Sequence, residues 1–343
     1  YVFKRYDSEV QGRAVLRPGE ADAGVIAPIE GRDVGLAFSV DGNPFYGIID
    51  PYQGGALAVC EAARNVASVG AVPSTVTDCL NYGNPEIEEV FWEFSEGVRG
   101  IGDACRGIGL ISHEGNPLPV VSGNVSFYNQ GESGKAIPPS PVIACVGVTD
   151  DYSRCRSIQW KEEGSAVYYI GEPLDELGGS EYYRSIYGTI GANVPEADFI
   201  RERNQIKAVI EMHSLGWVRA CHDTSQGGML TALAEMAIGG GGSGALGLKL
   251  DLEEFSGTGL EPEKILFSET GGFIVELPDG IEREVLALCT RNRVKLFKLG
   301  RLTGRPKLEV TSKGESLAAW TTEELSKAFL GGCRGIFGLD EKG

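Results

Sequence analysis

The spacing of apolar residues varies along the chain: some form short runs typical of strands, and others recur at the spacing of a helix. Apolar runs at residues 24–29 and 33–40 predict two strands near the start. Small apolar residues at helical spacing predict a buried helix over 56–69, with Glu61 and Arg64 together on its other face. The first part of the chain is therefore expected to combine strands with a tightly packed helix.

A second helix has the clearest start signal in the sequence. Asn84 is a good N-cap and Pro85 suits the first helical position. Glutamates in the next four residues place negative charge near the helix N-terminus, where the helix dipole favours it. One apolar stripe then runs over residues 87–108 and ends at glycines. We predict a helix that begins at Asn84.

Strands and helices alternate through the rest of the chain, so each half is expected to be an α/β sheet with helices packed on it. The polar stretch 150–164 separates the halves and predicts domains at 1–155 and 156–343. The further expected strands are 119–121, 142–148, 166–170, 218–221, 246–252, 272–277 and 295–302, and the further expected helices are 200–214, 228–238, 261–267 and 281–292.

Composition excludes several classes of protein. The 343 residues suggest about two domains. No apolar run approaches the roughly 18 residues of a membrane span, and the first residues do not resemble a signal peptide, so we expect a soluble, cytoplasmic protein with no membrane partner. The formal charge of −17 repels nucleic acid, so no nucleic-acid partner is expected and any nucleotide should be a small molecule in a local pocket.

Cysteine and histidine usage narrows the chemistry further. The eight cysteines are scattered without a CxxC pair, which predicts buried, reduced thiols rather than a disulfide or zinc framework. Only three histidines occur, at 113, 213 and 222, so a mechanism needing several imidazoles is excluded. His113 and His213 are expected at the surface rather than as ligands.

Two polar clusters lie where predicted strands give way to loops, where α/β sheets collect ligands. In the first, residues 77–85, Asp78 and Asn81 precede a helix start, which fits a metal-bridged phosphate or, equally, a capped loop. In the second, residues 122–129, Gly123 permits close backbone approach. Beside it, an asparagine oxygen suits Mg²⁺ and a serine hydroxyl suits phosphate, although a plain polar turn is the alternative.

A third cluster opens the 228–238 helix. His222 and Asp223 are followed by a Gly-Gly turn, which predicts an anion site at the helix start. The members of a hydrolase catalytic triad are distant in the chain, so these adjacent residues are not interpreted as a catalytic triad. Residues 267–272, which include Glu269, form a similar polar junction.

Taken together and in order, these segments resemble the phosphoribosylformylglycinamidine synthase family of purine synthesis, a branch of the aminoimidazole ribonucleotide synthetase-like proteins. The segments that carry the resemblance are 42–44, 50–55, 61–66, 70–73, 77–86, 122–129 and 222–228. The synthetase of that family resembles two tandem copies of one unit, and this chain is similar to the second copy. The resemblance implies an N-terminal domain that contributes strands to a shared barrel and a C-terminal α/β sandwich.

The family pattern also implies roles for individual residues. It places ATP contacts at Asp78 and Gly123, a Mg²⁺ ligand at Asn124 and a contact to formylglycinamide ribonucleotide at Ser126. The residues implied for an auxiliary nucleotide site are Asn81, His222, Asp223 and Glu269. No catalytic residue is expected in this half, because nothing here matches the family's catalytic histidine segment. One departure from the pattern is a short insertion at 111–118, expected near the edge of the pocket.

The implied reaction is that of an ATP-dependent carbon–nitrogen ligase. ATP phosphorylates the substrate amide oxygen, and ammonia then displaces phosphate to give the amidine, ADP and phosphate. The implied partners are the first half of the synthetase, a glutaminase subunit that supplies ammonia and a small accessory subunit. The chain alone is expected to be inactive, and the exposed half-barrel is expected to drive self-association.

Two other readings stay open. Aminoimidazole ribonucleotide synthetase usually has a G-x-G-T-K segment and selenophosphate synthetase a reactive cysteine or selenocysteine near its start, and neither pattern occurs here. A nucleotide-binding scaffold half, inactive without its partner, is the alternative from a different functional class.

Overall fold

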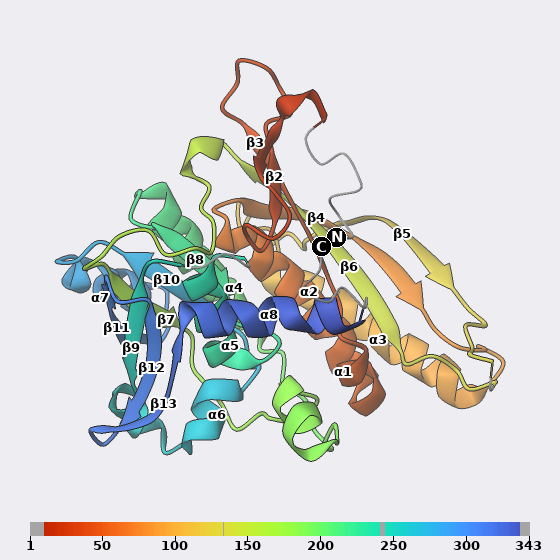
Figure 1. Cartoon of the computed structure of the whole chain (residues 1–343). Coiled ribbons are helices and arrows are strands. Elements are labelled where there is room, and N and C mark those ends of the chain that lie inside the picture. The colour runs from red at the N-terminus through yellow and green to blue at the C-terminus, as the bar shows by residue number, and fades with distance from the viewer. Residues whose placement is uncertain (1–9, 133, 241–243, 337–343) are drawn as a thin grey trace.

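The computed structural model describes residues 10–132, 134–240 and 244–336, with side chains described to residue 332. These residues form two mixed α/β units, each built on one sheet (Figure 1). The sheet of the first unit has the order β1-β2-β3-β6-β4-β5, and the sheet of the second has the order β13-β12-β9-β11-β7-β10-β8. The predicted fold class of sheets covered by helices is thereby confirmed, and neither sheet closes into a barrel.

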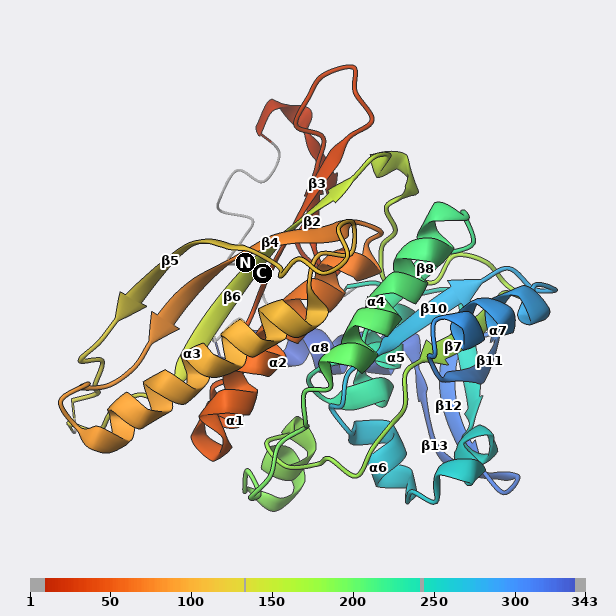
Figure 2. The ribbon, with the colours of Figure 1, turned by 180° about the vertical axis from the view of Figure 1, so that it is seen from behind.

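In the first unit, helices cover one face of the sheet (Figures 1 and 2). Only β4 and β5 pair in parallel, whereas the other neighbours are antiparallel. The strands are β1 Ala14–Leu16, β2 Gly24–Ile26, β3 Gly35–Asp41, β4 Val72–Asn81, β5 Val120–Ser126 and β6 Ser140–Thr149, and the helices are α1 Pro44–Ile49, α2 Pro51–Ser68 and α3 Glu88–Ile108.

Helix α2 is the buried small-residue helix that the sequence predicts, but it begins five residues earlier, at Pro51. The Asp50 side chain accepts a hydrogen bond of 3.0 Å from the Gln53 N–H, which caps the helix ahead of a proline at its first position. Small residues let α3 pack closely against it, because a Cβ on Gly55 would lie 2.3 Å from the carbonyl oxygen of Gly97. The centre of the first unit is therefore a close helix pair.

The predicted start of helix α3 is wrong. The helix begins at Glu88, and Asn84 does not cap it. Instead the Asn84 side chain accepts a hydrogen bond of 2.9 Å from the Glu86 N–H and closes a turn before the helix. Asn stabilises such turns as readily as helix caps, so its position in the sequence does not distinguish the two.

The second unit confirms the predicted alternation, and adds two strands and a helix after residue 306 that the sequence analysis did not predict. Its strands are β7 Ala166–Ile170, β8 Ala220–Asp223, β9 Gly247–Asp251, β10 Phe273–Leu277, β11 Leu296–Thr303, β12 Lys307–Ser312 and β13 Glu315–Thr321, and its helices are α4 Phe199–Ser214, α5 Gly228–Ile238, α6 Pro262–Phe267, α7 Glu282–Arg291 and α8 Thr322–Ile336.

The two units share a junction in which α2 packs against α4 and β8. One hydrophobic cluster continues across it, from Val59 and Val66 of α2 to Val209 of α4. His213 lies in this junction, so its predicted surface position is wrong: it is 4% exposed and its Nε2 lies 2.9 Å from the carbonyl oxygen of Ser68. Burial lowers the pKa of His213 to about 4, which keeps the ring neutral at neutral pH.

The cysteines in the described part of the chain agree with the prediction of buried, reduced thiols. Seven cysteines there are free, and six of the seven are buried; the Cys333 side chain lies outside the described residues. His113 is exposed, as predicted. Within the described ranges, no helix has the length and apolar character needed to cross a membrane.

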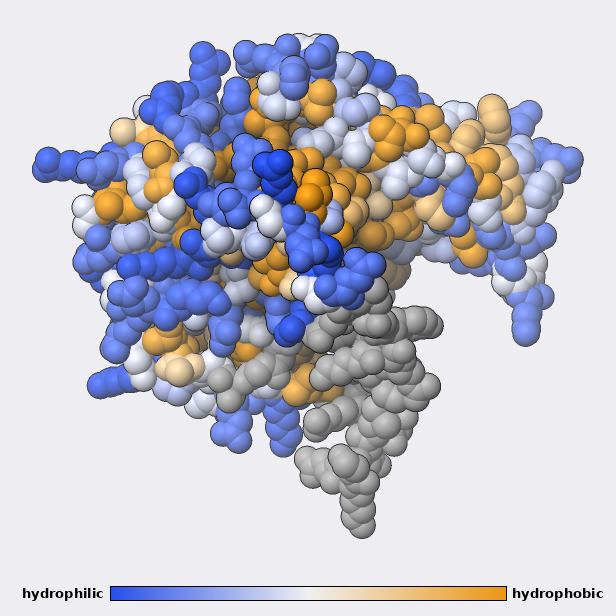
Figure 3. Space-filling model, turned by 90° about the horizontal axis from the view of Figure 1, so that it is seen from above, coloured by the Kyte–Doolittle hydropathy of each residue, from blue (hydrophilic) through white to orange (hydrophobic). Residues whose placement is uncertain are grey.

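The face of the first sheet that lies away from α2 and α3 keeps hydrophobic side chains exposed. Val40 is 68% exposed, and Phe38 is also exposed. In Figure 3 hydrophobic side chains gather on the right-hand arm, where β4, β5 and α3 lie in Figure 1. Such a surface is larger than scattered apolar residues produce and is typical of an interaction site.

Candidate functional site

Strands β4 and β5 bring the first two predicted clusters together. Their parallel register pairs Asp78 with Gly123 and Asn81 with Ser126. The approach is close, because a Cβ on Gly123 would lie 2.4 Å from Oδ1 of Asp78. Only glycine leaves room for the carboxylate over the neighbouring backbone.

These residues lie inside strands, so their predicted placement in loops is wrong. β4 extends to Asn81 and β5 to Ser126. Ser, Gly and Asn are poor strand formers, but the ladder with β4 supplies the backbone hydrogen bonds that overcome this local preference.

The two faces of the strand pair carry different residues. Asp78 and Gly123 share the face toward the helices, because Asp78 also pairs with the buried Ile143. Successive side chains alternate between faces, so Asn124 and Ser126 point to the opposite, open face. Asp78 and Asn124 therefore lie on opposite faces of this strand pair. β5 is the edge strand of the sheet, and its side chains are exposed from Val120 to Val125.

Hydrogen bonds hold the open-face residues in place. The Ser126 hydroxyl lies 3.2 Å from Oδ1 of Asn129, and Nδ2 of Asn129 donates to the carbonyl oxygens of Ser126 (2.8 Å) and Tyr82 (3.1 Å). Nδ2 of Asn81 donates to the Ser140 carbonyl oxygen at 3.1 Å. Asn129 was not singled out from the sequence, although it lies within the 122–129 cluster.

Burial raises the pKa of Asp78 above its usual range. Among the described residues, no lysine or arginine is paired with this carboxylate. A ligand that brings a metal ion or another positive group would therefore stabilise its charged form. The pair of strands can thus offer a carboxylate, an amide, a hydroxyl and exposed backbone at one edge.

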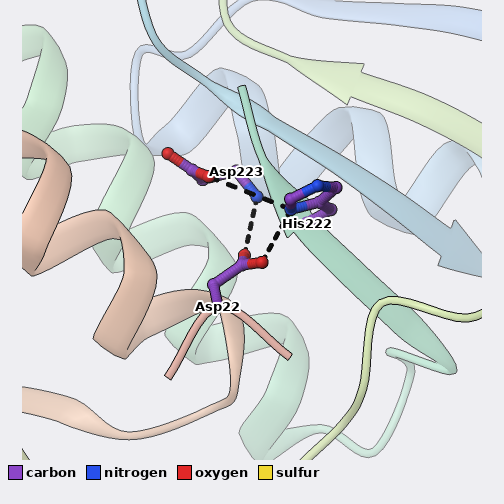
Figure 4. Close-up of side chains that lie close together, drawn as sticks. All are labelled: Asp22, His222 and Asp223. Atoms are coloured by element: carbon purple, nitrogen blue, oxygen red, sulfur yellow. Dashed lines mark hydrogen bonds and ion pairs between the residues drawn. The ribbon is translucent and has the colours of Figure 1, made fainter. Parts of the chain in front are cut away.

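The predicted residues His222 and Asp223 lie at the end of β8, in the junction between the units. Asp22, from the segment before β2, meets both of them (Figure 4). Its Oδ1 lies 2.7 Å from Nδ1 of His222, and its Oδ2 accepts a hydrogen bond of 2.9 Å from the Asp223 N–H. On its other side, Nε2 of His222 lies 2.8 Å from Oε2 of Glu235 on α5.

Several carboxylates surround this meeting point, and one arginine balances them. Arg64 of α2 is 3% exposed; its Nη1 lies 3.0 Å from Oε2 of Glu202, and its Nε lies 3.5 Å from Oδ2 of Asp223. Burial lowers the pKa of His222, but Asp22 and Glu235 outweigh burial and raise it well above its usual range. The imidazole is therefore a cation in this cluster.

The other titratable groups show that negative charge is in excess here. Burial, and then Glu61, raise the pKa of Asp41 to about 7. Burial and the neighbouring Asp22 raise the pKa of Asp223 well above its usual range, against the opposing effect of Arg64. Such raised values are typical of a site that a metal ion completes.

The carboxylates fit a divalent cation that prefers oxygen. The ligand atoms of Asp22 and Asp223 lie within 4.8 Å of one another, whereas His222 beside them, as a cation, does not ligate a metal. Three buried oxygens beside them have no hydrogen-bond partner: Oδ2 of Asp41, Oδ1 of Asn65 and Oδ2 of Asp223. Carboxylate and amide oxygens are the ligands that Mg²⁺ takes in proteins.

Sequence reasoning missed most of this cluster. Asp22 was not considered, and Glu61 and Arg64 were placed only on the second face of their helix. The available signal was the pair of charges on an otherwise apolar helix, because a helix buried on all sides has to pair its charges with other elements.

Glu269 does not join the His222 cluster through any hydrogen bond or ion pair found among the described residues; it binds backbone and a tyrosine instead. Its Oε1 accepts hydrogen bonds from the N–H groups of Gly227 (2.7 Å) and Glu181 (2.9 Å), and its Oε2 accepts from the Tyr46 hydroxyl. The N–H of Gly227, expected to bind an anionic ligand, is thus bound to a carboxylate of the chain. Burial raises the pKa of Glu269 to about 7, although these three donors lower it.

The 111–118 insertion contacts helix α4. Oε1 of Glu114 lies 3.8 Å from Nη2 of Arg203 and 3.5 Å from Nζ of Lys207. Leu118 is buried at the end of the insertion. The insertion therefore adds contacts between the two units.

Comparison with known families agrees with the two-unit structure. The AIR synthase related protein N-terminal domain matches residues 20–149, and the C-terminal domain of the same family matches residues 162–313. Together the two matches take in most of the chain.

Curated relatives are similar over nearly the whole chain. The PurL subunit of phosphoribosylformylglycinamidine synthase from Methanothrix thermoacetophila is 49% identical over 334 residues, which are 97% of this chain and 42% of that subunit. The PurL subunit from Moorella thermoacetica is 39% identical over 95% of this chain and 42% of that subunit. The chain thus spans about two fifths of the length of these relatives.

Solved structures show the same fold. T. maritima PurL complexed with FGAR gives a TM-score of 0.72 at 19% identity, over 92% of this chain and 49% of that one. T. maritima PurL complexed with ATP gives a TM-score of 0.70, also at 19% identity, over 94% of this chain and 49% of that one. The chain therefore belongs to the AIR synthase related family and corresponds to part of a phosphoribosylformylglycinamidine synthase PurL subunit.

Proposed function

We propose that the chain acts as the second half of an ATP-dependent phosphoribosylformylglycinamidine synthase. The observation that carries this proposal is the 49% identity to a PurL subunit over 97% of the chain, together with the adjacency of Asp78 and Gly123. The reaction converts formylglycinamide ribonucleotide, ATP and ammonia to the amidine, ADP and phosphate. The catalytic acid and base come from the first half of the enzyme.

Each predicted residue has a role in the proposed site. The nucleotide lies across the edge strand β5 and contacts Asp78 and Gly123 on one face. Asn124 binds Mg²⁺ and Ser126 contacts the substrate on the other face, and the exposure of β5 supports access to both. Mg²⁺ would neutralise charge on the phosphates when bound. Asn129 holds the Ser126 hydroxyl in position through their hydrogen bond.

The junction between the units serves a separate, auxiliary role in this proposal. The oxygens of Asp22 and Asp223, with the unpartnered amide oxygen of Asn65, hold a divalent cation that binds nucleotide phosphates. His222 and Glu269, and Asn81 on β4, support the surrounding structure, because each is already bound by neighbouring groups of the chain.

The proposed partners follow from the PurL relationship. A solved T. maritima assembly is described as PurLQS, which supports a glutaminase subunit and a small accessory subunit for this chain as well. The open face of the first sheet is proposed to complete a shared barrel with the first half of the synthetase or with a second copy. We also propose a cytoplasmic location and a domain boundary at residues 155/156, which falls between the two family matches.

The test is a turnover assay on the chain alone and with the first half of a PurL subunit added. We expect ammonia-dependent ADP release and amidine only in the mixture. Turnover by the chain alone would contradict the assignment of the catalytic groups to the other half. Nucleotide binding without turnover in the mixture would favour a scaffold role.

A further inference from the structure

A cavity of about 320 Å³ lies in the second unit, away from both sites described above. It is formed by Gly171 at the end of β7, by the first turns of α4 and by the turn between α7 and β11. The cavity thus brings together three segments that are distant in the chain.

Three cations line the cavity, on a chain whose formal charge is −17. They are Arg201 on α4 and Arg293 and Lys295 before β11. Two acids, Glu172 and Asp198, also line it. Oδ1 of Asp198 is already occupied, because it accepts hydrogen bonds from the first N–H groups of α4 at 3.0 and 3.1 Å. With three cations against two acids, the cavity carries one positive charge in excess.

Two polar atoms in the cavity wall lack partners. Gln205 lines the cavity and is 1% exposed, yet its Oε1 has no hydrogen-bond partner. Nε of Arg201, one helical turn earlier, is also buried without a partner, although Nη2 of Arg201 donates to the Glu196 carbonyl oxygen at 3.2 Å. Unpaired buried polar atoms are rare, and an absent ligand is one physical explanation for them.

Arg293 adopts a backbone conformation that arginine disfavours. Its φ is 57°, at the residue that follows the C-cap of helix α7, where its N–H donates to Thr290 O at 3.0 Å and the Val294 N–H donates to Cys289 O at 2.9 Å. Glycine or asparagine usually occupies this position. Strain of this kind is often kept for the sake of a side chain that functions.

We propose that this cavity binds a small organic oxyanion, a phosphate ester or a carboxylate, that also carries an O–H or N–H group. Arg201, Arg293 and Lys295 bind the anionic oxygens. The O–H or N–H group of the ligand donates to Oε1 of Gln205 after a small rotation of that side chain. The site is separate from the β4–β5 edge and from the junction between the units.

The experiment is a calorimetric titration of the chain at constant ionic strength with glycerol 3-phosphate, malate and sulfate. We expect saturable binding with a Kd of about 1 mM or tighter for glycerol 3-phosphate or for malate, each of which carries a hydroxyl donor. The better of these two probes identifies the phosphate or the carboxylate class, and weaker binding of sulfate, an oxyanion without an O–H group at neutral pH, tests the role of the donor group.

Arg293→Gly is the informative variant, because it removes the cation and the strain together. We expect it to weaken binding at least tenfold while the melting temperature stays the same or rises. Lys313→Gly is the matched control, since Lys313 is an exposed cation with a φ of 51° in the β12–β13 turn. It should leave affinity unchanged. No saturable binding of any probe, equal binding by sulfate, or equal affinity in the two variants would overturn the proposal.

Discussion

Asp78 is the single residue whose charge the proposed nucleotide site depends on most. Asp78→Asn should weaken Mg-ATP binding by about 1–3 kcal/mol, the usual cost of losing a charged partner of a buried group. The melting temperature should change little, because the side chain packs mainly over a glycine. Calorimetric titration measures the affinity, with Asp175→Asn as an exposed control in the second unit. Equal affinity of Asp78→Asn and the wild type would contradict a role for this carboxylate.

Glu269 should make stability depend on pH below neutrality. Its pKa rises from 4.5 to about 7 on folding, so between these values the folded chain holds a proton that the unfolded chain has lost. The free energy of unfolding should therefore fall as pH rises from 4.5 to 7, by at most about 1.4 kcal/mol per pH unit. Above pH 7 this group adds no further change.

Glu269→Gln should flatten that slope, because the amide does not titrate. Asp41, whose pKa is also about 7, contributes a slope of the same sign, whereas His213, whose pKa is lowered to about 4, opposes it below pH 6.5 in both proteins. Urea unfolding at pH 5, 6 and 7 provides the measurement, and Glu254→Gln, at an exposed position, is the control. A slope that is unchanged in Glu269→Gln would show that this carboxyl is already ionised below pH 7.

At the scale of elements, helix α2 joins the two units through Arg64. Arg64→Ala should destabilise the chain by about 3–5 kcal/mol, because it leaves Glu202 and Asp223 as buried charges without their partner. Mg²⁺ should restore part of the loss if the junction binds a cation. Urea unfolding with and without Mg²⁺ tests both effects. Arg99→Ala, which breaks an exposed pair with Glu96, should destabilise the chain far less than Arg64→Ala and show no Mg²⁺ effect.

At the scale of the whole molecule, the exposed sheet face should drive association. Sedimentation at micromolar concentrations should show dimers, because the open face and the free edge of the first sheet leave apolar side chains and backbone groups uncovered. Val40→Asp should shift the equilibrium to monomer without lowering the melting temperature, since Val40 is 68% exposed. Leu286→Asp, on the exposed side of α7, is the control, and it should leave the monomer–dimer equilibrium unchanged. A wild-type chain that sediments only as monomer would contradict this expectation.

The sequence by itself determined the local elements with strong periodicity and indicated the segments of the proposed site. Helix α4 and strands β7 and β10 lie within a residue or two of their predicted ranges, because their apolar spacing agrees with their final burial. Asp78, Gly123, Asn124 and Ser126 could be named in advance, since polar residues and glycine interrupt apolar runs there.

Only the tertiary structure decided how these residues meet. β5 extends through Ser126 because β4 pairs with it, and the two-residue period of a strand then sends Asn124 to the face opposite Asp78. Asp22 reaches Asp223, 201 residues away, and Arg64 is buried between the units, through packing that no local pattern encodes. Local sequence fixes which backbone conformation a residue favours, whereas a buried charge is satisfied by whichever element packs against it, and that depends on the whole fold.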